Sequence, residues 1–225
     1  MRLEPAGVVA VKICCIADIG EARLAQAAGA DALGLVSAMP SGPGVISDER
    51  VAEVALAVRN EAVHTFLLTA RTRADDIAEQ HRRCGTTTLQ LVDHVPLAEL
   101  VRLRRLCPGV ALVQVIHVSG EAALAEAQAV AGHVDALLLD SGNPTLAVKQ
   151  LGGTGRTHDW ALSRRIRDAV FPLPLWLAGG LNAGNVAQAV ARVAPHGVDL
   201  CNGVRTQGRL DAVKLAAFIA VARAV

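Results

Sequence analysis

The chain has 225 residues, of which 52% are hydrophobic and 19% are charged, and its formal net charge is +1. A composition this apolar excludes a disordered chain, and the length is enough to bury a sizeable core. The near-zero charge gives no basis for a nucleic-acid or membrane surface, and an aromatic content of 2% argues against a base-stacking platform. We expect a single domain over residues 1–225.

The cysteines predict neither a disulfide framework nor a zinc site, because their number is odd and no two have CxxC spacing. The histidines lack HxH and HxxxH spacing, so no metal site is expected. No apolar run reaches the roughly 18 residues that a membrane span needs. The N-terminus has no sustained apolar region of the kind found in signal peptides. We therefore expect a cytoplasmic protein with reduced thiols.

Short apolar runs alternate with longer helical patterns along the whole chain. We predict strands at 8–15, 31–36, 62–68, 86–91, 110–116, 134–139, 174–178 and 197–201. We predict helices at 19–28, 48–60, 72–84, 96–106, 120–131, 158–170, 183–193 and 211–224. Strands that are apolar throughout are typical of parallel sheets covered on both faces.

The eight strand–helix units favour an α/β fold, a single (β/α)8 TIM barrel. A doubly wound open sheet is the alternative, but no GxGxxG motif follows the first strand. Two long connections, 37–47 and 140–157, follow predicted strands and would lie on the catalytic face of a barrel.

The first strand carries a lysine and a thiol two residues apart. Because side chains alternate along a strand, Lys12 and Cys14 share one face and Cys15 lies on the other. A lysine is hard to bury beneath the outer helices, so the face with Lys12 should line the barrel mouth. Cys14 then points toward a ligand, although a free cysteine at a strand end is more often packing material.

Asp140 ends the sixth strand, where barrel enzymes place acids and bases. Capping of a turn with Ser141 and Gly142 is an equally good interpretation. The loop that follows contains Gly153 and Gly155, which suit either an anion cradle or a flexible connector.

Glycine turns follow the last two strands. Gly179 and Gly180 let a phosphate approach backbone N–H groups without a Cβ in the way, and the next helix adds partial positive charge. Asn202 and Gly203 form the second turn. Such turns are weak signals alone, but barrels commonly hold phosphate after strands seven and eight.

These segments together resemble the phosphoribosylanthranilate isomerase family, in order and over nearly the whole chain. The segments that carry the resemblance are 11–14 (VKIC), 28–36 (AGADALGLV), 89–91 (LQL), 138–141 (LLDS), 152–160 (GGTGRTHDW), 177–182 (LAGGLN), 185–186 (NV), 198–199 (VD) and 203–204 (GV).

The resemblance implies an Amadori rearrangement in tryptophan biosynthesis, in which an N-(5-phosphoribosyl) arylamine becomes a 1-amino-1-deoxyribulose 5-phosphate. The family's general acid falls on Asp140 and its general base on Cys14. Lys12 on the same face is expected to lower the pKa of Cys14, and Gln90 is a further substrate contact. The resemblance implies no metal or organic cofactor. We expect a small phosphorylated sugar amine as partner, and a monomer or homodimer.

The chain departs from the family at the end of the substrate that carries the amine. Cys15 replaces a glycine, the loop 41–47 lacks the arginine that meets the anthranilate carboxylate, 90–93 reads QLVD for QLHG, and 201–205 reads CNGVR for SSGVE. Arg205 or Arg209 is a candidate replacement contact. The substrate is therefore either phosphoribosylanthranilate or a relative with another arylamine.

Two other functions stay open from the sequence. One is a non-catalytic barrel that binds a sugar phosphate. The other is a different phosphate-binding barrel enzyme, such as an aldolase or epimerase, in which Lys12 forms a Schiff base.

Overall fold

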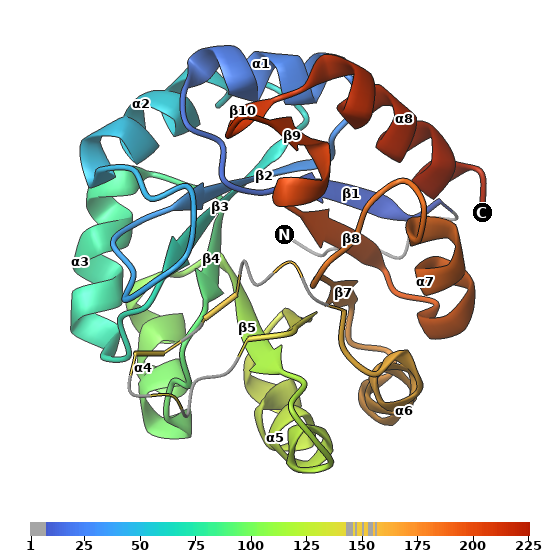
Figure 1. Ribbon diagram of the computed structural model, residues 1–225. Helices are drawn as coiled ribbons and strands as arrows, with labels where there is room; N and C mark the ends of the chain where they lie inside the picture. The colour runs from blue at the N-terminus through green and yellow to red at the C-terminus, as the bar shows by residue number, and fades with distance from the viewer. Residues whose placement is uncertain (1–7, 143–145, 147, 150, 153–154, 156) are drawn as a thin grey trace.

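The computed structural model describes residues 8–142, 146, 148–149, 151–152, 155 and 157–225. Eight parallel strands form a closed barrel in chain order, and β1 pairs with β8 to close it (Figure 1). The barrel strands are β1 (Ala10–Ile13), β2 (Ala32–Val36), β3 (His64–Thr69), β4 (Thr88–Leu91), β5 (Ala111–His117), β6 (Ala136–Asp140), β7 (Leu175–Leu177) and β8 (Gly197–Leu200). The predicted (β/α)8 barrel is confirmed.

A helix follows each strand on the outside of the barrel (Figure 1). The helices are α1 (Ile19–Ala27), α2 (Asp48–Ala57), α3 (Ala74–Cys84), α4 (Leu97–Leu106), α5 (Ala122–Val130), α6 (Trp160–Val170), α7 (Val186–Val193) and α8 (Ala212–Arg223). Short 3-10 turns lie at Ala131–His133 and Asn202–Val204. Strands and helices begin and end within three residues of the predicted bounds. None of the helices in the described ranges is long and apolar enough to cross a membrane.

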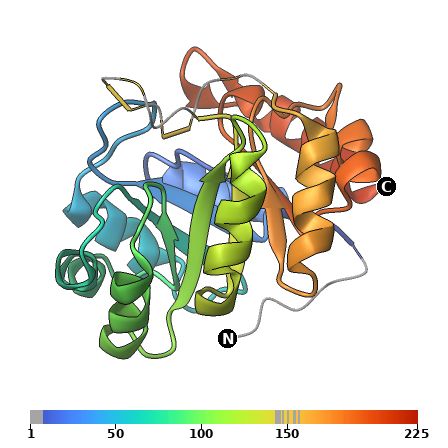
Figure 2. The ribbon, with the colours of Figure 1, turned by 90° about the horizontal axis from the view of Figure 1, so that it is seen from below.

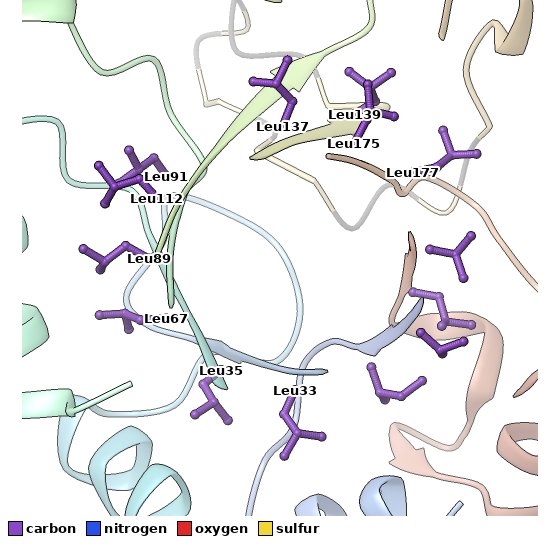
Figure 3. Packing of buried hydrophobic residues seen from close by; sticks show 14 of the residues in the cluster. Leu33, Leu35, Leu67, Leu89, Leu91, Leu112, Leu137, Leu139, Leu175 and Leu177 are labelled. Atoms are coloured by element: carbon purple, nitrogen blue, oxygen red, sulfur yellow. The ribbon is translucent and has the colours of Figure 1, made fainter. Parts of the chain in front are cut away.

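Leucines on the outer face of the strands hold the helices to the barrel. Figure 3 shows them pointing away from the barrel interior, and each is at most 1% exposed. They are Leu33, Leu35, Leu67, Leu89, Leu91, Leu112, Leu137, Leu139, Leu175 and Leu177. Because side chains alternate along a strand, the residues between them face inward and fill the barrel.

Two aromatic rings fill part of the barrel interior near Gly197, the first residue of β8. Phe66 and Trp176 pack edge to face with their ring centroids 5.7 Å apart. Gly197 makes room for the indole, because a Cβ there would lie 2.5 Å from Trp176 Cζ3. The barrel interior is therefore filled by side chains toward the end where the strands begin. A ligand can enter only from the end where the strands finish.

The long connections gather at that end of the barrel. In Figure 2 the β2–α2 connection, drawn in blue, and the described parts of the β6–α6 connection, drawn in yellow, lie along the top of the view. Ser41 Oγ donates a hydrogen bond to Lys149 O at 2.7 Å, so the two long connections touch. Lys149 Nζ also pairs with Asp93 Oδ2 at 2.5 Å.

A hairpin that the sequence did not predict follows β8. Its strands are β9 (Arg205–Thr206) and β10 (Arg209–Leu210), which pair antiparallel. Gln207 and Gly208 join them with φ of 50° and 78°. Positive φ at both central residues is the signature of a type I′ hairpin turn.

Candidate active site

A pocket of about 310 Å³ opens where the barrel strands end. Its walls come from the ends of β1, β2, β3, β4, β6, β7 and β8 and from the two long connections. Cys14 and Asp140 both line it, the first directly after β1 and the second as the last residue of β6. The structure thus brings the two residues expected as base and acid to one cavity.

Asp140 sits in surroundings that favour its neutral form. Burial raises the pKa of Asp140, although Ser141 N donates a hydrogen bond to Oδ1 at 2.7 Å and favours the anion. Gly152, with φ of 125°, packs against the carboxyl group, since a Cβ there would lie 2.5 Å from Oδ2. A carboxylic acid that keeps its proton in a cavity is suited to general-acid chemistry.

Lys12 lies inside the barrel and not at its mouth. Its side chain is 0% exposed, and Nζ lies 2.9 Å from Asp199 Oδ1. Burial alone would lower the pKa of Lys12, but the Asp199 carboxylate outweighs it and the pKa is raised. Lys12 therefore stays an ammonium ion, which disfavours the Schiff-base hypothesis, because that chemistry needs a neutral amine.

Lys12 and Cys14 do share the inner face of the barrel. A Cβ on Gly34 would lie 2.9 Å from Lys12 Nζ and 2.8 Å from Cys14 Sγ, so Gly34 leaves space for both. Neither Lys12 Nζ nor Asp199 Oδ1 makes another hydrogen bond to a described residue. The expected effect of Lys12 on the Cys14 thiol stays a prediction.

Replacing Lys12 with Met is expected to lower the free energy of unfolding by about 3 kcal/mol. The change leaves the Asp199 carboxylate buried without its cation, which costs more than an intact pair contributes. Urea denaturation at pH 7 measures the loss. Adding Asp199→Asn to the Lys12→Met variant should recover part of it. A single variant as stable as the unmodified protein would contradict the pairing.

Two glycine turns form the wall of the pocket between β7 and β8. Gly179, Gly180, Asn202 and Gly203 all line the cavity, and the first two have φ of 86° and 64°. The turns touch, since a Cβ at Gly203 would lie 2.3 Å from Leu181 O. Close approach of two backbones at this point of a barrel suits a phosphate group.

Replacing Gly203 with Ala is expected to weaken the binding of ribose 5-phosphate about tenfold, or about 1.4 kcal/mol. The methyl group would push the turn after β7 out of place. Calorimetric titration measures the dissociation constant. Gly132→Ala is the matched control, because nothing lies within 4 Å of a Cβ at that position. Equal affinity in both variants would count against this part of the pocket as the phosphate site.

Some of the other residues predicted to contact the ligand line the pocket and others do not. Gly155 and Gln90 line the pocket, and Gln90 Oε1 has no hydrogen-bond partner in the part of the chain that is described. Gly153 lies outside the described residues. Arg209 is exposed on β10.

Arg205 is not among the residues that line the pocket. Its guanidinium pairs with Glu21, with Nη1 2.9 Å from Oε1 and Nη2 3.0 Å from Oε2. Nη2 also donates to Cys14 O at 3.3 Å and to Cys15 O at 2.5 Å. Its donors hold the turn between β1 and α1, and a substrate contact at Arg205 stays a prediction.

The sequence also misplaced Cys15 and missed Asp199 and Cys201. The predicted strand 8–15 stops at Ile13, and Cys15 has φ of 61°, which turns the chain and brings its side chain to the pocket. The glycine that the family carries at this position was the available signal. Asp199 and Cys201 line the pocket from β8 and the residue after it.

The wall opposite the glycine turns is apolar. Val36, Met39, Pro43 and Leu68 contribute to it, and Leu151 adds the β6–α6 connection. No lysine or arginine of the described ranges lines the cavity. An uncharged ring fits this wall better than a carboxylate does.

A model of the family described as N-(5'phosphoribosyl)anthranilate (PRA) isomerase matches residues 11–221. N-(5'-phosphoribosyl)anthranilate isomerase of Haloferax volcanii is 37% identical over 217 residues, covering 95% of this chain and 92% of that protein. The enzyme of the same name from Thermosynechococcus vestitus is 32% identical, covering 94% and 88%.

Similar solved structures come from the same family. Phosphoribosyl anthranilate isomerase of Thermotoga maritima superposes with a TM-score of 0.82 at 27% identity, covering 97% of this chain and 100% of that chain. A phosphoribosyl anthranilate isomerase in complex with reduced 1-(o-carboxyphenylamino)-1-deoxyribulose 5-phosphate gives 0.80 at 25% identity with the same coverage. From the family match, the curated relatives and the barrel, the chain belongs to the N-(5'-phosphoribosyl)anthranilate isomerase family.

Proposed function

We propose that the protein catalyses the Amadori rearrangement of an N-(5-phosphoribosyl) arylamine to a 1-(arylamino)-1-deoxyribulose 5-phosphate. One observation carries the proposal: Cys14, Asp140 and the glycine turns at 179–180 and 202–203 line the same pocket. The relative solved with a reduced deoxyribulose phosphate supports a ligand of this class.

Asp140 acts first, as the general acid. It donates its proton to the furanose ring oxygen while the bond between that oxygen and C1 breaks, and the nitrogen lone pair forms the iminium ion. Because burial raises its pKa, Asp140 keeps this proton to a higher pH than an exposed aspartate does. Activity should therefore fall as the pH rises through the pKa of Asp140.

Cys14 acts second, as the general base. It removes the proton from C2, and the electron pair of that bond forms the C1–C2 double bond while the iminium nitrogen takes up its own pair. The enolamine then gains a proton at C1 and loses the hydroxyl proton at C2 to give the ketone. A thiol performs this step as the thiolate. No metal or organic cofactor enters the scheme.

The apolar wall favours a second candidate substrate, an arylamine without a carboxylate. Val36, Met39 and Leu68 would contact the aromatic ring, while Asp140 and Asp199 place two acidic groups in the same cavity. Because no lysine or arginine of the described ranges lines the cavity, a carboxylate on the ring would have no cation to pair with there. This wall should therefore favour an adduct whose aromatic ring lacks the carboxylate over phosphoribosylanthranilate itself.

The test compares the N-(5-phosphoribosyl) adducts of anthranilate and aniline, each made from ribose 5-phosphate and the free amine. The purified protein is expected to convert at least one adduct to the ketose well above the rate in buffer, followed by chromatography and, for anthranilate, by loss of fluorescence. Robust turnover of the anthranilate adduct removes the alternative substrate. Failure to convert either adduct with folded protein contradicts the proposed function.

A further inference from the structure

Arg205 links the glycine turn after β8 to the residue proposed as the base. It directly follows the 3-10 turn Asn202–Val204, which contributes to the pocket wall. Its guanidinium reaches back to the end of β1, where Nη2 lies 3.3 Å from Cys14 O and 2.5 Å from Cys15 O. One side chain therefore connects the two parts of the pocket that would hold the phosphate and take the C2 proton.

Glu21 on α1 also fixes this guanidinium. The two side chains form a two-pronged pair and are only 8% and 13% exposed. The same carboxylate accepts hydrogen bonds from Leu210 N at 2.9 Å and from Ala17 N at 3.1 Å. Burial alone would raise the pKa of Glu21, but the hydrogen bonds, first among them those from Arg205, outweigh it and the pKa is lowered. The pair therefore stays ionised, in the geometry that makes arginine–carboxylate contacts strong.

The β9–β10 hairpin holds the arginine in one position. Nη1 donates to Gly208 O at 3.0 Å in the turn of the hairpin, and Lys214 Nζ donates to Arg205 O at 2.9 Å. Each Nη atom has two hydrogens and at least two acceptors within the protein. The end of the side chain is therefore fixed by its contacts and not free to change its direction.

The arginine takes the place of strand pairing where β1 ends. Cys14 N donates at 2.8 Å to the carbonyl of Leu200, the last residue of β8. Because β8 ends there, the donor to Cys14 O is the side chain of Arg205 and not the next stretch of the strand. The φ of Cys15, 61°, lets the following carbonyl face the same donor, and such a conformation persists only where the surroundings hold it. Arg205 thus fixes the backbone from which the Cys14 side chain projects.

We propose that Arg205 is a positioning residue, which holds Cys14 at the reacting position and ties it to the turn Asn202–Val204. The inference rests on the proposed function, because it concerns how the base of that reaction is placed. An error of about 1 Å in placing a reacting group can cost on the order of 10²-fold in rate. The glutamate that the family carries at position 205 has no hydrogen to donate to the two carbonyls when ionised, so this arrangement depends on the arginine.

The test replaces Arg205 with Lys and with Ala in the full chain. Lysine keeps a charge for Glu21 but lacks the planar fork that reaches both carbonyls, and we expect kcat to fall about tenfold. Alanine also leaves the carboxylate without its cation, and kcat should fall on the order of 10²-fold. In the lysine variant, KM and the dissociation constant of ribose 5-phosphate should stay within about twofold of their values in the unmodified protein. If Arg205→Ala does not fold, Arg205→Lys decides.

Arg223→Gln is the matched control, because Arg223 makes contacts of the same kind near the start of β1. Its Nη2 lies 2.7 Å from Gly29 O and 3.0 Å from Asp31 Oδ2, and that carboxylate accepts a hydrogen bond from Val11 N at 2.7 Å. None of these residues lines the pocket. The control should lose stability and keep the kcat of the unmodified protein. An equal loss of kcat in Arg223→Gln and Arg205→Lys would overturn the proposal.

Hydrogen exchange followed by NMR measures the hold on Cys14 without any assay of turnover. In Arg205→Lys the amides of Cys14 and Ile16 should exchange faster than in the unmodified protein, whereas in Arg223→Gln they should not. Unchanged exchange at Cys14 or an unchanged kcat in folded Arg205→Lys overturns the proposal. Weaker ribose 5-phosphate binding with kcat intact also overturns it, and would make Arg205 a substrate contact.

The proposed function and the role of Arg205 fail separately. If the unmodified protein converts neither arylamine adduct, the isomerase activity fails, and hydrogen exchange alone decides whether Arg205 holds Cys14. If the unmodified protein is active and Arg205→Lys equals it in kcat, the isomerase activity stands and the positioning role fails.

Discussion

Replacing Asp140 with Asn is expected to lower kcat by about 10³-fold, within the range of roughly 10²–10⁴ that general acids contribute. The amide has nearly the same shape and still accepts the hydrogen bond from Ser141 N, but it has no proton to give to the ring oxygen. Steady-state turnover of the better arylamine adduct measures the effect.

The same variant should not lose stability. Since the pKa of Asp140 is raised, folding favours the neutral acid, and a neutral amide avoids burying a charge. Its thermal midpoint at pH 7 should equal or exceed that of the unmodified protein. The alkaline fall of kcat/KM, which reports the deprotonation of Asp140, should disappear in the residual activity. A kcat near that of the unmodified protein would remove Asp140 from the mechanism.

Replacing Cys14 with Ser is expected to lower kcat by about 10³-fold through loss of the base that takes the C2 proton. A serine hydroxyl is slightly smaller than the thiol and fits beside Gly34, but it is a far weaker base at neutral pH. Binding of ribose 5-phosphate should change little, because the glycine turns remain intact. Stopped assays with enough enzyme measure the residual rate.

Cys107→Ser provides the control for the Cys14 variant. Cys107 is 4% exposed, packs in the outer core and does not line the pocket. It should retain the kcat of the unmodified protein. If Cys14→Ser turned over as fast as this control, another group would have to remove the C2 proton.

The barrel was predictable because eight short apolar runs alternate with longer helical patterns along the whole chain. Strands that alternate with amphipathic helices leave few other arrangements. The position of Cys14 followed from the alternation of side chains along the first strand, and that of Asp140 from the end of the sixth strand. Both features can be recognised in a short stretch of sequence.

Features that depend on distant partners were not predictable in this way. Arg205 pairs with Glu21, 184 residues earlier, and nothing in its own segment reveals that partner. Lys12 was expected at the mouth because a lysine is hard to bury beneath the outer helices, whereas pairing with Asp199 lets it be buried. Cys15 departs from strand alternation through one backbone angle, which only the surrounding structure selects.

In the proposed reaction, Cys14 and Asp140 together convert a phosphoribosyl arylamine into a ketose. Carbon-13 NMR of the reaction tests it most directly, with the anthranilate and aniline adducts of ribose 5-phosphate labelled at C1. We expect the unmodified protein to convert the C1 methine signal of at least one adduct into a methylene signal. Over the same time, Asp140→Asn and Cys14→Ser should convert it no faster than buffer does. Folded, phosphate-binding protein that leaves both methine signals unchanged would contradict it.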